Sequence, residues 1–325
     1  MNRLAIYIFI VVLFSNCRDE NPNPPFEDSF YRIEMRQFVI RLSEYSKAIK
    51  STFVIIPQNG VELISKTGIA SSGENSEYLN AIDGTGQEGL FYGYENLDLA
   101  TPISINWYFK GFLNLSKNAG KAIFIIDYCA NPLHITNSFE ENNTLGFHSF
   151  AAEERSLSTI PPLPLPLFQE NNQTNTSLSQ IKNFLFLINP KNFSTKNDFI
   201  SAITATNYDL LVMDLFFHDG SEFTTSEINQ LRNKANGSKR MLICYMSIGE
   251  AERYRYYWQT NWDNSPPVWL DAGNPNWPGN YKVKYWEPDW QNIIFGNNES
   301  YLKKIINAGF DGVYLDLIDA FKFYE

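Results

Sequence analysis

Eight short apolar runs, separated by amphipathic segments, are the feature that most constrains the fold of this chain. Each run has the length of a β-strand, and uninterrupted apolar strands are typical of a parallel sheet covered by helices. Eight is the number of parallel strands that closes a (β/α)8 barrel, so the pattern predicts an α/β protein with a single TIM barrel. The runs lie at residues 53–57, 79–84, 122–128, 184–189, 209–216, 241–246, 282–286 and 312–317.

The two ends of this pattern predict a circularly permuted barrel. Apolar residues at three- and four-residue steps predict a helix over residues 34–50, with no strand before it. The last predicted strand, 312–317, has no full helix after it. Since a barrel strand is normally followed by its helix, we expect the N-terminal helix to follow the C-terminal strand in space.

A stretch without periodicity, residues 156–179, interrupts the alternation. It contains alternating Pro and Leu and then a run rich in Asn, Gln and Thr, a composition typical of a linker. The length of 325 residues allows two domains, but the three predicted strands before the linker and the five after it cannot close separate barrels. We therefore predict that 156–179 joins the two halves of one barrel that extends over residues 31–325.

The first thirty residues have the pattern of an export signal and a tether. A short basic start precedes an apolar run at residues 4–14, which is too short to span a bilayer and has signal-peptide proportions. Ser15 and Asn16 then precede Cys17, which resembles a bacterial lipoprotein cleavage site. We predict a signal peptide over 1–16, a lipid anchor on Cys17 and a tether over 17–30. Ordinary secretion, with Cys17 incidental, is the alternative.

The expected location is the outer membrane. The residues that follow Cys17, Arg18-Asp19-Glu20, resemble the acidic tag that sends some lipoproteins to the cell surface. We therefore expect an exported, lipid-anchored monomer, with the cell surface as one destination.

Charge and composition argue against several classes of partner. Lys and Arg number 26 and Asp and Glu 36, a net charge of −10 that argues against nucleic-acid binding and permits a cationic partner. Cys129 and Cys244 lie in apolar runs and are expected to be buried thiols. The three histidines lack metal-site spacing and no Gly-rich phosphate loop precedes a helix, so we expect neither metal nor cofactor.

Five motifs carry a resemblance to a known family. Three lie in the second half of the chain: Cys244-Tyr-Met-Ser-Ile-Gly-Glu250, Trp286-Glu-Pro-Asp-Trp290 and Gly309-Phe-Asp-Gly-Val-Tyr-Leu-Asp-Leu-Ile-Asp319. Two lie in the first: Ile55-Ile-Pro-Gln-Asn-Gly60 and Ile82-Asp-Gly-Thr-Gly-Gln-Glu88. Together they resemble glycoside hydrolase family 114. In most members the last two motifs follow the Asp-Gly-Val segment. Here they precede it, as the predicted permutation requires.

The resemblance implies a TIM-barrel fold and the family's type activity, endo-α-1,4-polygalactosaminidase, which acts on α-linked galactosamine polymers. It also implies an acidic pair that falls on Asp316 and Glu88. The residues agree, because Asp316 ends an apolar strand and Glu88 lies in a Gly-rich turn after a strand, with only strand 53–57 between them. We predict a retaining mechanism with Asp316 as nucleophile and Glu88 as acid/base. The reversed roles are the alternative.

Other side chains near predicted strand ends are candidates for substrate binding. Carboxylates there can bind substrate ammonium groups, and aromatic rings can stack on sugars. For the polar residues, loop or helix-cap bonding is the alternative, and for the aromatic residues, burial in the core. The candidates are Asp214, Asp127, Asn59, Ser247, Glu250, Tyr128, Tyr245 and Trp286, with Tyr92, Tyr94, Tyr285 and Trp290 in similar positions.

Taken together, these features predict an endo-acting glycoside hydrolase that cleaves α-1,4-linked, galactosamine-containing polysaccharide. Two alternatives stay open. One is a surface glycan-binding lipoprotein on an inactive barrel, and the other is an enzyme of the same mechanism on a different α-linked glycan. The expected partners are the polysaccharide and, through Cys17, a membrane.

Overall fold

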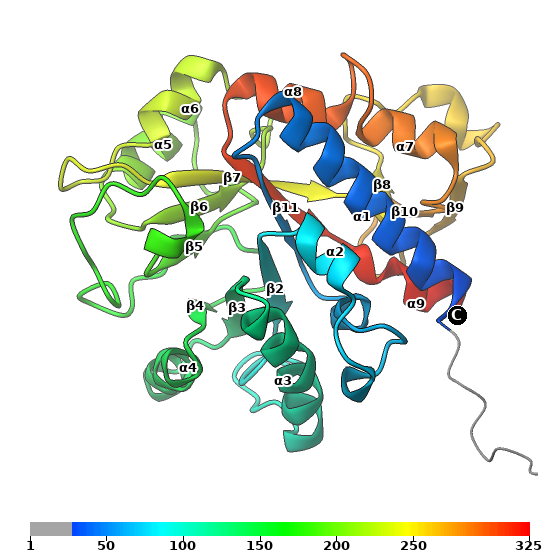
Figure 1. Ribbon diagram of the computed structural model, residues 1–325. Helices are drawn as coiled ribbons and strands as arrows, with labels where there is room; N and C mark the ends of the chain where they lie inside the picture. Colours follow the sequence, from blue (N-terminus) through cyan, green and yellow to red (C-terminus); the bar gives the residue numbers. More distant parts are fainter. Residues whose placement is uncertain (1–27) are drawn as a thin grey trace, which may run out of the picture.

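Parallel strands and helices alternate along residues 28–325, the part of the chain that the computed structural model describes (Figure 1). The predicted signal peptide, Cys17 and most of the tether lie outside the described residues. The strands are β1 (Val54–Pro57), β2 (Gly84–Glu88), β3 (Ala122–Tyr128), β4 (His148–Ala152), β5 (Phe184–Phe186), β6 (Leu210–Met213), β7 (Met241–Ser247), β8 (Glu250–Glu252), β9 (Leu270–Gly273), β10 (Asn280–Val283) and β11 (Gly312–Asp316).

Helices separate most of the parallel strands and pack against the sheets. None of the helices between residues 28 and 325 combines the length and the apolar character needed to cross a bilayer. The helices are α1 (Phe30–Ile49), α2 (Ser76–Ala81), α3 (Ile103–Asn118), α4 (Pro132–Leu145), α5 (Lys196–Thr204), α6 (Thr225–Leu231), α7 (Pro288–Ile294), α8 (Tyr301–Ala308) and α9 (Phe321–Tyr324).

The eight parallel strands follow the order of a (β/α)8 barrel. One sheet has the order β1-β11-β7-β6-β5 and another the order β2-β3-β4. A parallel bridge between Gln58 and Gly86 joins β1 to β2. Between β4 and β5 no ladder pair forms in the described residues, but the two strands lie next to each other and the rings of Phe150 and Phe184 are 5.8 Å apart. The strand order therefore returns to β1, which agrees with the predicted α/β barrel.

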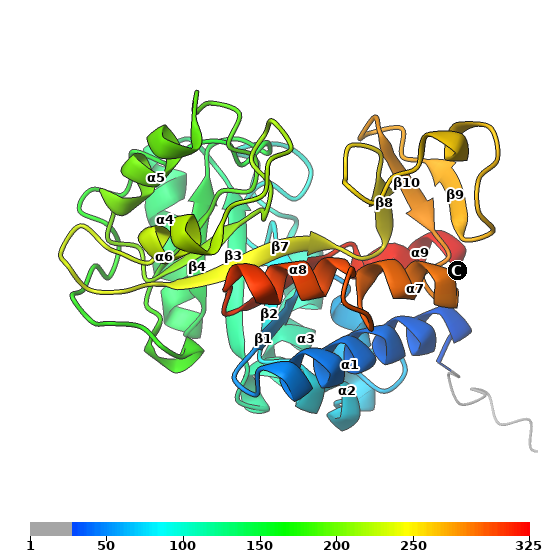
Figure 2. The same ribbon diagram turned by 90° about the horizontal axis from the view of Figure 1, so that it is seen from above.

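Helix α1 takes the place of the helix that should follow β11. Strands β1 and β11 are parallel neighbours, with Val54 opposite Gly312. Their approach requires a glycine, because a Cβ on Gly312 would lie 2.3 Å from the carbonyl oxygen of Val54. Helix α1 packs against α8, which precedes β11, and against α2, which precedes β2 (Figure 2). This is the permuted arrangement that the sequence predicts.

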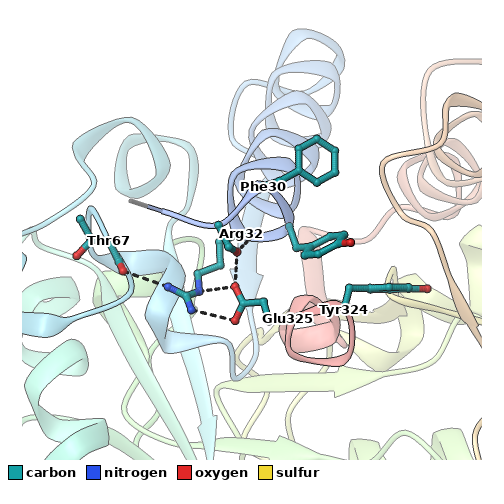
Figure 3. A pocket seen from close by; sticks show the side chains of 7 residues that line it. Phe30, Arg32, Thr67, Tyr324 and Glu325 are labelled. Carbon is teal, nitrogen blue, oxygen red and sulfur yellow. Dashed lines mark hydrogen bonds and ion pairs between the residues drawn. The ribbon is translucent and has the colours of Figure 1, made fainter. Parts of the chain in front are cut away.

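An ion pair ties the start of α1 to the C-terminal residue (Figure 3). Arg32 Nε lies 2.8 Å from Glu325 Oε1, and Arg32 Nη2 donates to Glu325 Oε2 at 2.9 Å. Arg32 Nη1 also donates to the carbonyl of Thr67 at 3.1 Å. The rings of Tyr31 and Tyr324 pack 5.5 Å apart, so polar and aromatic contacts together hold α1 against α9.

Two predicted strands need correction. Residues 282–286 begin at the end of β10, which is antiparallel to β8 and β9 in a separate small sheet inserted after β7. Residues 79–84 mostly belong to α2 and the turn after it, and the barrel strand starts only at Gly84. The sequence does not predict β4, because His148–Ala152 contains one large apolar residue. The linker 156–179 therefore has four parallel strands on each side instead of three and five.

Alternation along the strands decides which side chains enter the barrel. Paired residues on parallel strands face the same side of the sheet. Tyr314 is paired with Ile56 and Tyr245, and its ring crosses the interior to within 4.9 Å of the ring of Phe186. The same alternation places the side chains at the carboxyl ends of these strands on the inner face of the barrel. These side chains are those of Asp316, Ser247, Glu88, Tyr128 and Asp214.

Candidate active site

Two carboxylates, Asp316 and Glu88, end the strands on either side of β1. Asp316 is the last residue of β11 and Glu88 the last of β2, so Glu88 ends its strand instead of following it in a turn. Both lie on the inner face, at the barrel end where active sites collect. The two carboxyl groups interact electrostatically, because the negative charge of Glu88 contributes to the raised pKa of Asp316.

Asp316 is a carboxyl group whose proton exchanges near neutral pH. Burial, followed by the negative charge of Glu88, raises the pKa of Asp316 from 3.8 to about 7. Two hydrogen bonds oppose this rise: Tyr245 Oη donates to Asp316 Oδ2 at 2.6 Å, and the backbone N–H of Leu317 donates to Oδ1 at 2.8 Å. Leu317 has a φ of 58°, a left-handed backbone conformation that residues other than glycine rarely adopt.

Neutral donors hold Glu88 in place. Asn59 Nδ2 donates to Glu88 Oε2 at 2.9 Å, and the hydroxyl of Tyr128 donates to Oε1. Asn59 Oδ1 accepts in turn from the backbone N–H of Glu88 at 3.2 Å, so the amide grips both ends of the residue. The guanidinium carbon of Arg155 lies 4.5 Å from the ring centroid of Tyr128. These contacts fix the carboxylate without placing a cation directly on it.

A cleft of about 400 Å³ opens beside Glu88. Asp319, which the sequence does not single out as a site residue, lies in its wall. Burial raises the pKa of Asp319 to about 6, while the charge of Lys322 opposes the rise and that of Glu88 adds to it. The sequence signal that could have identified Asp319 as a site residue is its position three residues after Asp316, in the same family motif. Other wall residues are Asn59, Tyr94, Ile105, Tyr108, Phe109 and Arg155.

Asp127 does not reach this cleft, which corrects the prediction that it points into the barrel mouth. It alternates on β3 with Tyr128, which faces inward, and so it faces the opposite way. The side chain is fully buried and its carboxylate is saturated with protein donors, which secure the loop after β2. The donors are Phe91 N (2.9 Å), Tyr92 N (3.2 Å), Ser138 Oγ (2.7 Å) and Asn142 Nδ2 (3.2 Å).

Asp214 lies on the inner face as expected but is already paired. Arg255 Nη1 donates to Asp214 Oδ1 at 2.8 Å and Nη2 donates to Oδ2 at 2.6 Å. The same guanidinium also binds Glu252, and the two carboxylates hold the pKa of Arg255 well above its usual value, against the effect of burial. The sequence gives no sign of this ion network, because its members come from β6, β8 and the loop after β8.

Glu250 and Ser247 belong to the junction between β7 and the small sheet. Glu250 accepts hydrogen bonds from Asn274 Nδ2 at 2.8 Å and from Asn280 Nδ2 at 3.3 Å, and burial raises its pKa. Ser247 Oγ donates to the backbone carbonyl of Glu250 at 3.2 Å. Both side chains are nearly inaccessible, so neither offers a substrate the free polar group that the sequence predicts.

Trp286 packs in an aromatic cluster near the two chain ends. Its ring centroid is 5.2 Å from that of Tyr31 and 4.8 Å from that of Tyr324. A hollow of about 410 Å³ in this region contains Arg32 and Glu325, whose charges pair with each other (Figure 3). This region therefore lacks the unpaired acidic groups that distinguish the cleft beside Glu88.

Cys129 and Cys244 are buried free thiols, as the sequence predicts. Within residues 28–325, no three or more His, Cys, Asp or Glu side chains gather in a way that could hold a metal ion.

Comparison with known families supports a glycosidase relationship for the second half of the chain. A sequence model of glycoside-hydrolase family GH114 matches residues 188–324. The matched segment contains Asp316, Tyr245 and Arg255, while Glu88 and Asn59 precede it.

Three uncharacterised proteins are similar to part of the chain. An uncharacterised protein of Methanocaldococcus jannaschii is 44% identical over 135 residues, which are 41% of this chain and 36% of the relative. An uncharacterised protein of Deinococcus radiodurans is 40% identical over 126 residues (39% and 38%), and one of Thermotoga maritima is 38% identical over 122 residues (38% and 36%). The chain thus spans little more than a third of the length of these relatives.

One solved structure overlaps more of the chain. The active-site mutant of Rhizomucor miehei β-1,3-glucanosyltransferase in complex with laminaritriose covers 82% of this chain and 86% of its own, with 13% identity and a TM-score of 0.37. Similarity of this size supports no conclusion about function.

Proposed function

We propose that this chain, whose residues 188–324 match the sequence model of glycoside-hydrolase family GH114, is a glycoside hydrolase that cuts a polysaccharide with Asp316 and Glu88. The proposal extends to an endo-acting enzyme for α-1,4-linked, galactosamine-containing polymer with retention of configuration. The observation that carries it is the acidic pair: two carboxylates on strand ends that flank β1, close enough for one charge to raise the pKa of the other.

The environments of the two acids favour the reverse of the role assignment expected from the sequence. With its pKa near 7, Asp316 can carry a proton at neutral pH and give it to the leaving oxygen. Glu88 receives hydrogen bonds from Asn59 and Tyr128, which hold its carboxylate in a fixed position, as a nucleophile requires. We therefore assign Glu88 as nucleophile and Asp316 as acid/base.

The reaction then proceeds in two steps. A Glu88 carboxylate oxygen bonds to the anomeric carbon while the glycosidic C–O bond breaks, and Asp316 protonates the leaving oxygen. Asp316, now ionised, takes a proton from a water whose oxygen attacks the same carbon. The Glu88 ester bond breaks, and the sugar leaves with its original configuration.

The test is digestion of partly deacetylated galactosaminogalactan by the purified protein, with products followed by mass spectrometry and the anomeric signal by NMR. We expect shorter oligosaccharides whose new reducing ends are first of the α configuration. Products of the β configuration would rule out retention. Binding without cleavage, unchanged in Asp316→Asn, would support the glycan-binding alternative, and cleavage only of another α-glycan would move the substrate assignment.

Azide distinguishes the two acids. With an activated α-glycoside as substrate, Glu88→Ala in azide should give a β-glycosyl azide, because azide replaces the lost nucleophile directly. Asp316→Ala should give the α-glycosyl azide, because azide attacks the enzyme-bound intermediate. The opposite outcome for the two variants would restore Asp316 as nucleophile.

The anchor is a separate proposal that rests on the sequence of the first twenty residues. We expect the full-length protein to incorporate radiolabelled palmitate and partition into detergent, and Cys17→Ala to lose both properties. Secretion of the wild-type protein without label would support ordinary export.

A further inference from the structure

The cleft beside Glu88 has an aromatic wall that the two-carboxylate reaction does not use. Tyr94 and Tyr108 line it and are 45% and 42% exposed. Phe109 lies between them, with ring centroids 5.9 Å from Tyr94 and 5.8 Å from Tyr108. Exposed aromatic rings are costly to leave in water, and their flat faces suit the apolar C–H face of a pyranose.

The two rings are presented on secured supports. Tyr108 Oη donates to Glu62 Oε1 at 2.5 Å, and its ring packs 5.1 Å from that of Phe112. Tyr94 lies within a tight loop that is closed by a hydrogen bond from Gly93 N to the carbonyl of Leu99 at 2.8 Å. Gly93 must be glycine here, because its φ is 87° and a Cβ would lie 2.4 Å from Tyr128 Cβ. The loop that carries Tyr94 therefore packs on the residue that holds Glu88.

Asp127 holds the same loop in place. Its carboxylate accepts hydrogen bonds from the backbone N–H groups of Phe91 and Tyr92. These two residues directly precede Gly93 and Tyr94, which line the cleft. A buried acid thus orders the aromatic wall from behind, and ordered aromatic groups bind with little loss of conformational entropy.

Side chains of both charges line the cleft. Glu88 and Asp319 contribute negative charge, and Arg155 and Lys322 contribute positive charge. Lys322 Nζ is also 2.8 Å from Glu62 Oε1. An ammonium group in this cleft would meet Arg155 and Lys322 as well as the acids, whereas hydroxyl and acetamido groups would find both donors and acceptors.

We propose that this cleft is a subsite that holds an uncharged pyranose of the substrate chain, a neutral hexose or an N-acetylhexosamine, stacked on Tyr94 and Tyr108. The subsite rests on the proposed function, because the chain that occupies it is the one cut beside Glu88. It refines the substrate class: the polymer is a mixed one, in which an uncharged sugar lies next to the cleavage point on the Glu88 side.

The experiment measures binding separately from cleavage. The Asp316→Asn protein serves as the parent, and its affinity for two α-1,4-galactosamine hexasaccharides, one fully N-acetylated and one fully deacetylated, is measured by calorimetry. Into this parent are introduced Tyr94→Ala, Tyr108→Ala, Tyr94→Phe and the control Trp107→Ala. Trp107 is 65% exposed on α3 and directly precedes Tyr108, but it does not line the cleft.

We expect the parent to bind the acetylated hexasaccharide more tightly. Tyr94→Ala and Tyr108→Ala should each weaken that binding about five- to tenfold, since one aromatic stack is lost. Tyr94→Phe keeps the ring and should bind like the parent, as should Trp107→Ala. In the cleaving enzyme, Tyr94→Ala should raise KM for polymer with kcat unchanged.

Each other outcome has a distinct meaning. Equal binding by Tyr94→Ala and Trp107→Ala, or tighter binding of the deacetylated hexasaccharide, overturns the subsite and leaves hydrolysis standing. Tyrosine-dependent binding by a wild-type protein that cuts nothing overturns hydrolysis and leaves the subsite standing. A parent that binds neither hexasaccharide overturns the subsite as well.

Discussion

Two sets of acids on the inner side of this barrel end differ in what holds them. Asp316 and Glu88 are bound by uncharged donors, namely Tyr245, Tyr128 and Asn59. Asp214 instead receives both arms of Arg255, a cation buried against it. The inner position alone therefore does not make a reactive acid: neutral donors hold the carboxyl groups of Asp316 and Glu88, whereas a buried cation is paired with the carboxylate of Asp214.

The sharpest way to break this comparison is to remove each reactive acid without changing its shape. Glu88→Gln and Asp316→Asn should each lower kcat on polymer by about 10²–10⁴-fold, the range for lost general acid–base catalysis. Reducing-end release measures the loss, and circular dichroism confirms the fold. Either variant with wild-type activity would remove that residue from the mechanism.

The second prediction concerns Arg255. Arg255→Met leaves Asp214 and Glu252 as buried, unpaired carboxylates and should lower the free energy of unfolding by about 3–5 kcal/mol. Urea denaturation measures it. Arg253→Met is the matched control, because the Arg253–Asp263 pair is exposed and should contribute less than about 1 kcal/mol. Equal losses in the two variants would contradict the structural role of the buried network.

The third prediction concerns the donor to Asp316. The Tyr245 hydroxyl lowers the pKa of Asp316, so Tyr245→Phe should raise that pKa further, by about one unit for one lost hydrogen bond to a charged group. If Asp316 is the acid, the basic limb of kcat/KM moves to higher pH. Tyr256→Phe, whose hydroxyl binds the carbonyl of Glu299, should leave the limb in place. A shift to lower pH would contradict the assignment.

The last prediction concerns stability and follows from the direction in which the pKa of Asp316 is shifted. The folded pKa of Asp316, about 7, exceeds the ordinary 3.8, so the folded state holds this proton more tightly. Its contribution is complete below about pH 4 and disappears as pH rises through about 7. At pH 8, Asp316→Asn should therefore melt several degrees above wild type, because it removes a buried charge, and the gap should close at pH 4. Scanning calorimetry at the two pH values checks it, and a variant less stable at pH 8 would contradict the buried charge.

The sequence predicts the barrel strands well where apolar residues are dense. The runs that become β1, β3, β7 and β11 are almost entirely apolar, and such runs are typical of buried parallel strands. Strand β4 escapes prediction because small residues fill it, and residues 282–286 are mistaken for a barrel strand because β-propensity does not distinguish a parallel strand from an antiparallel hairpin.

The site is predicted where motif and strand end coincide, as at Asp316 and Glu88. Asp127 shows why the rest fails. It sits one residue before Tyr128, and in a strand that single step turns the side chain from the barrel interior to the helix layer. The Arg255 network could not be predicted for another reason: its members come together only when the loop after β8 folds back on the end of β6.

The pairing of β1 with β11 also affects when the barrel can form. Strand β1 is synthesised well before β11, its partner on one side. Until β11 arrives, β1 exposes an unpaired edge that can recruit other strands, and contacts so distant along the chain form slowly. Asp316 is the last residue of β11, so the acidic pair forms only once β11 has joined the sheet beside β1. The catalytic activity proposed for this pair would then report that the two distant strands have paired.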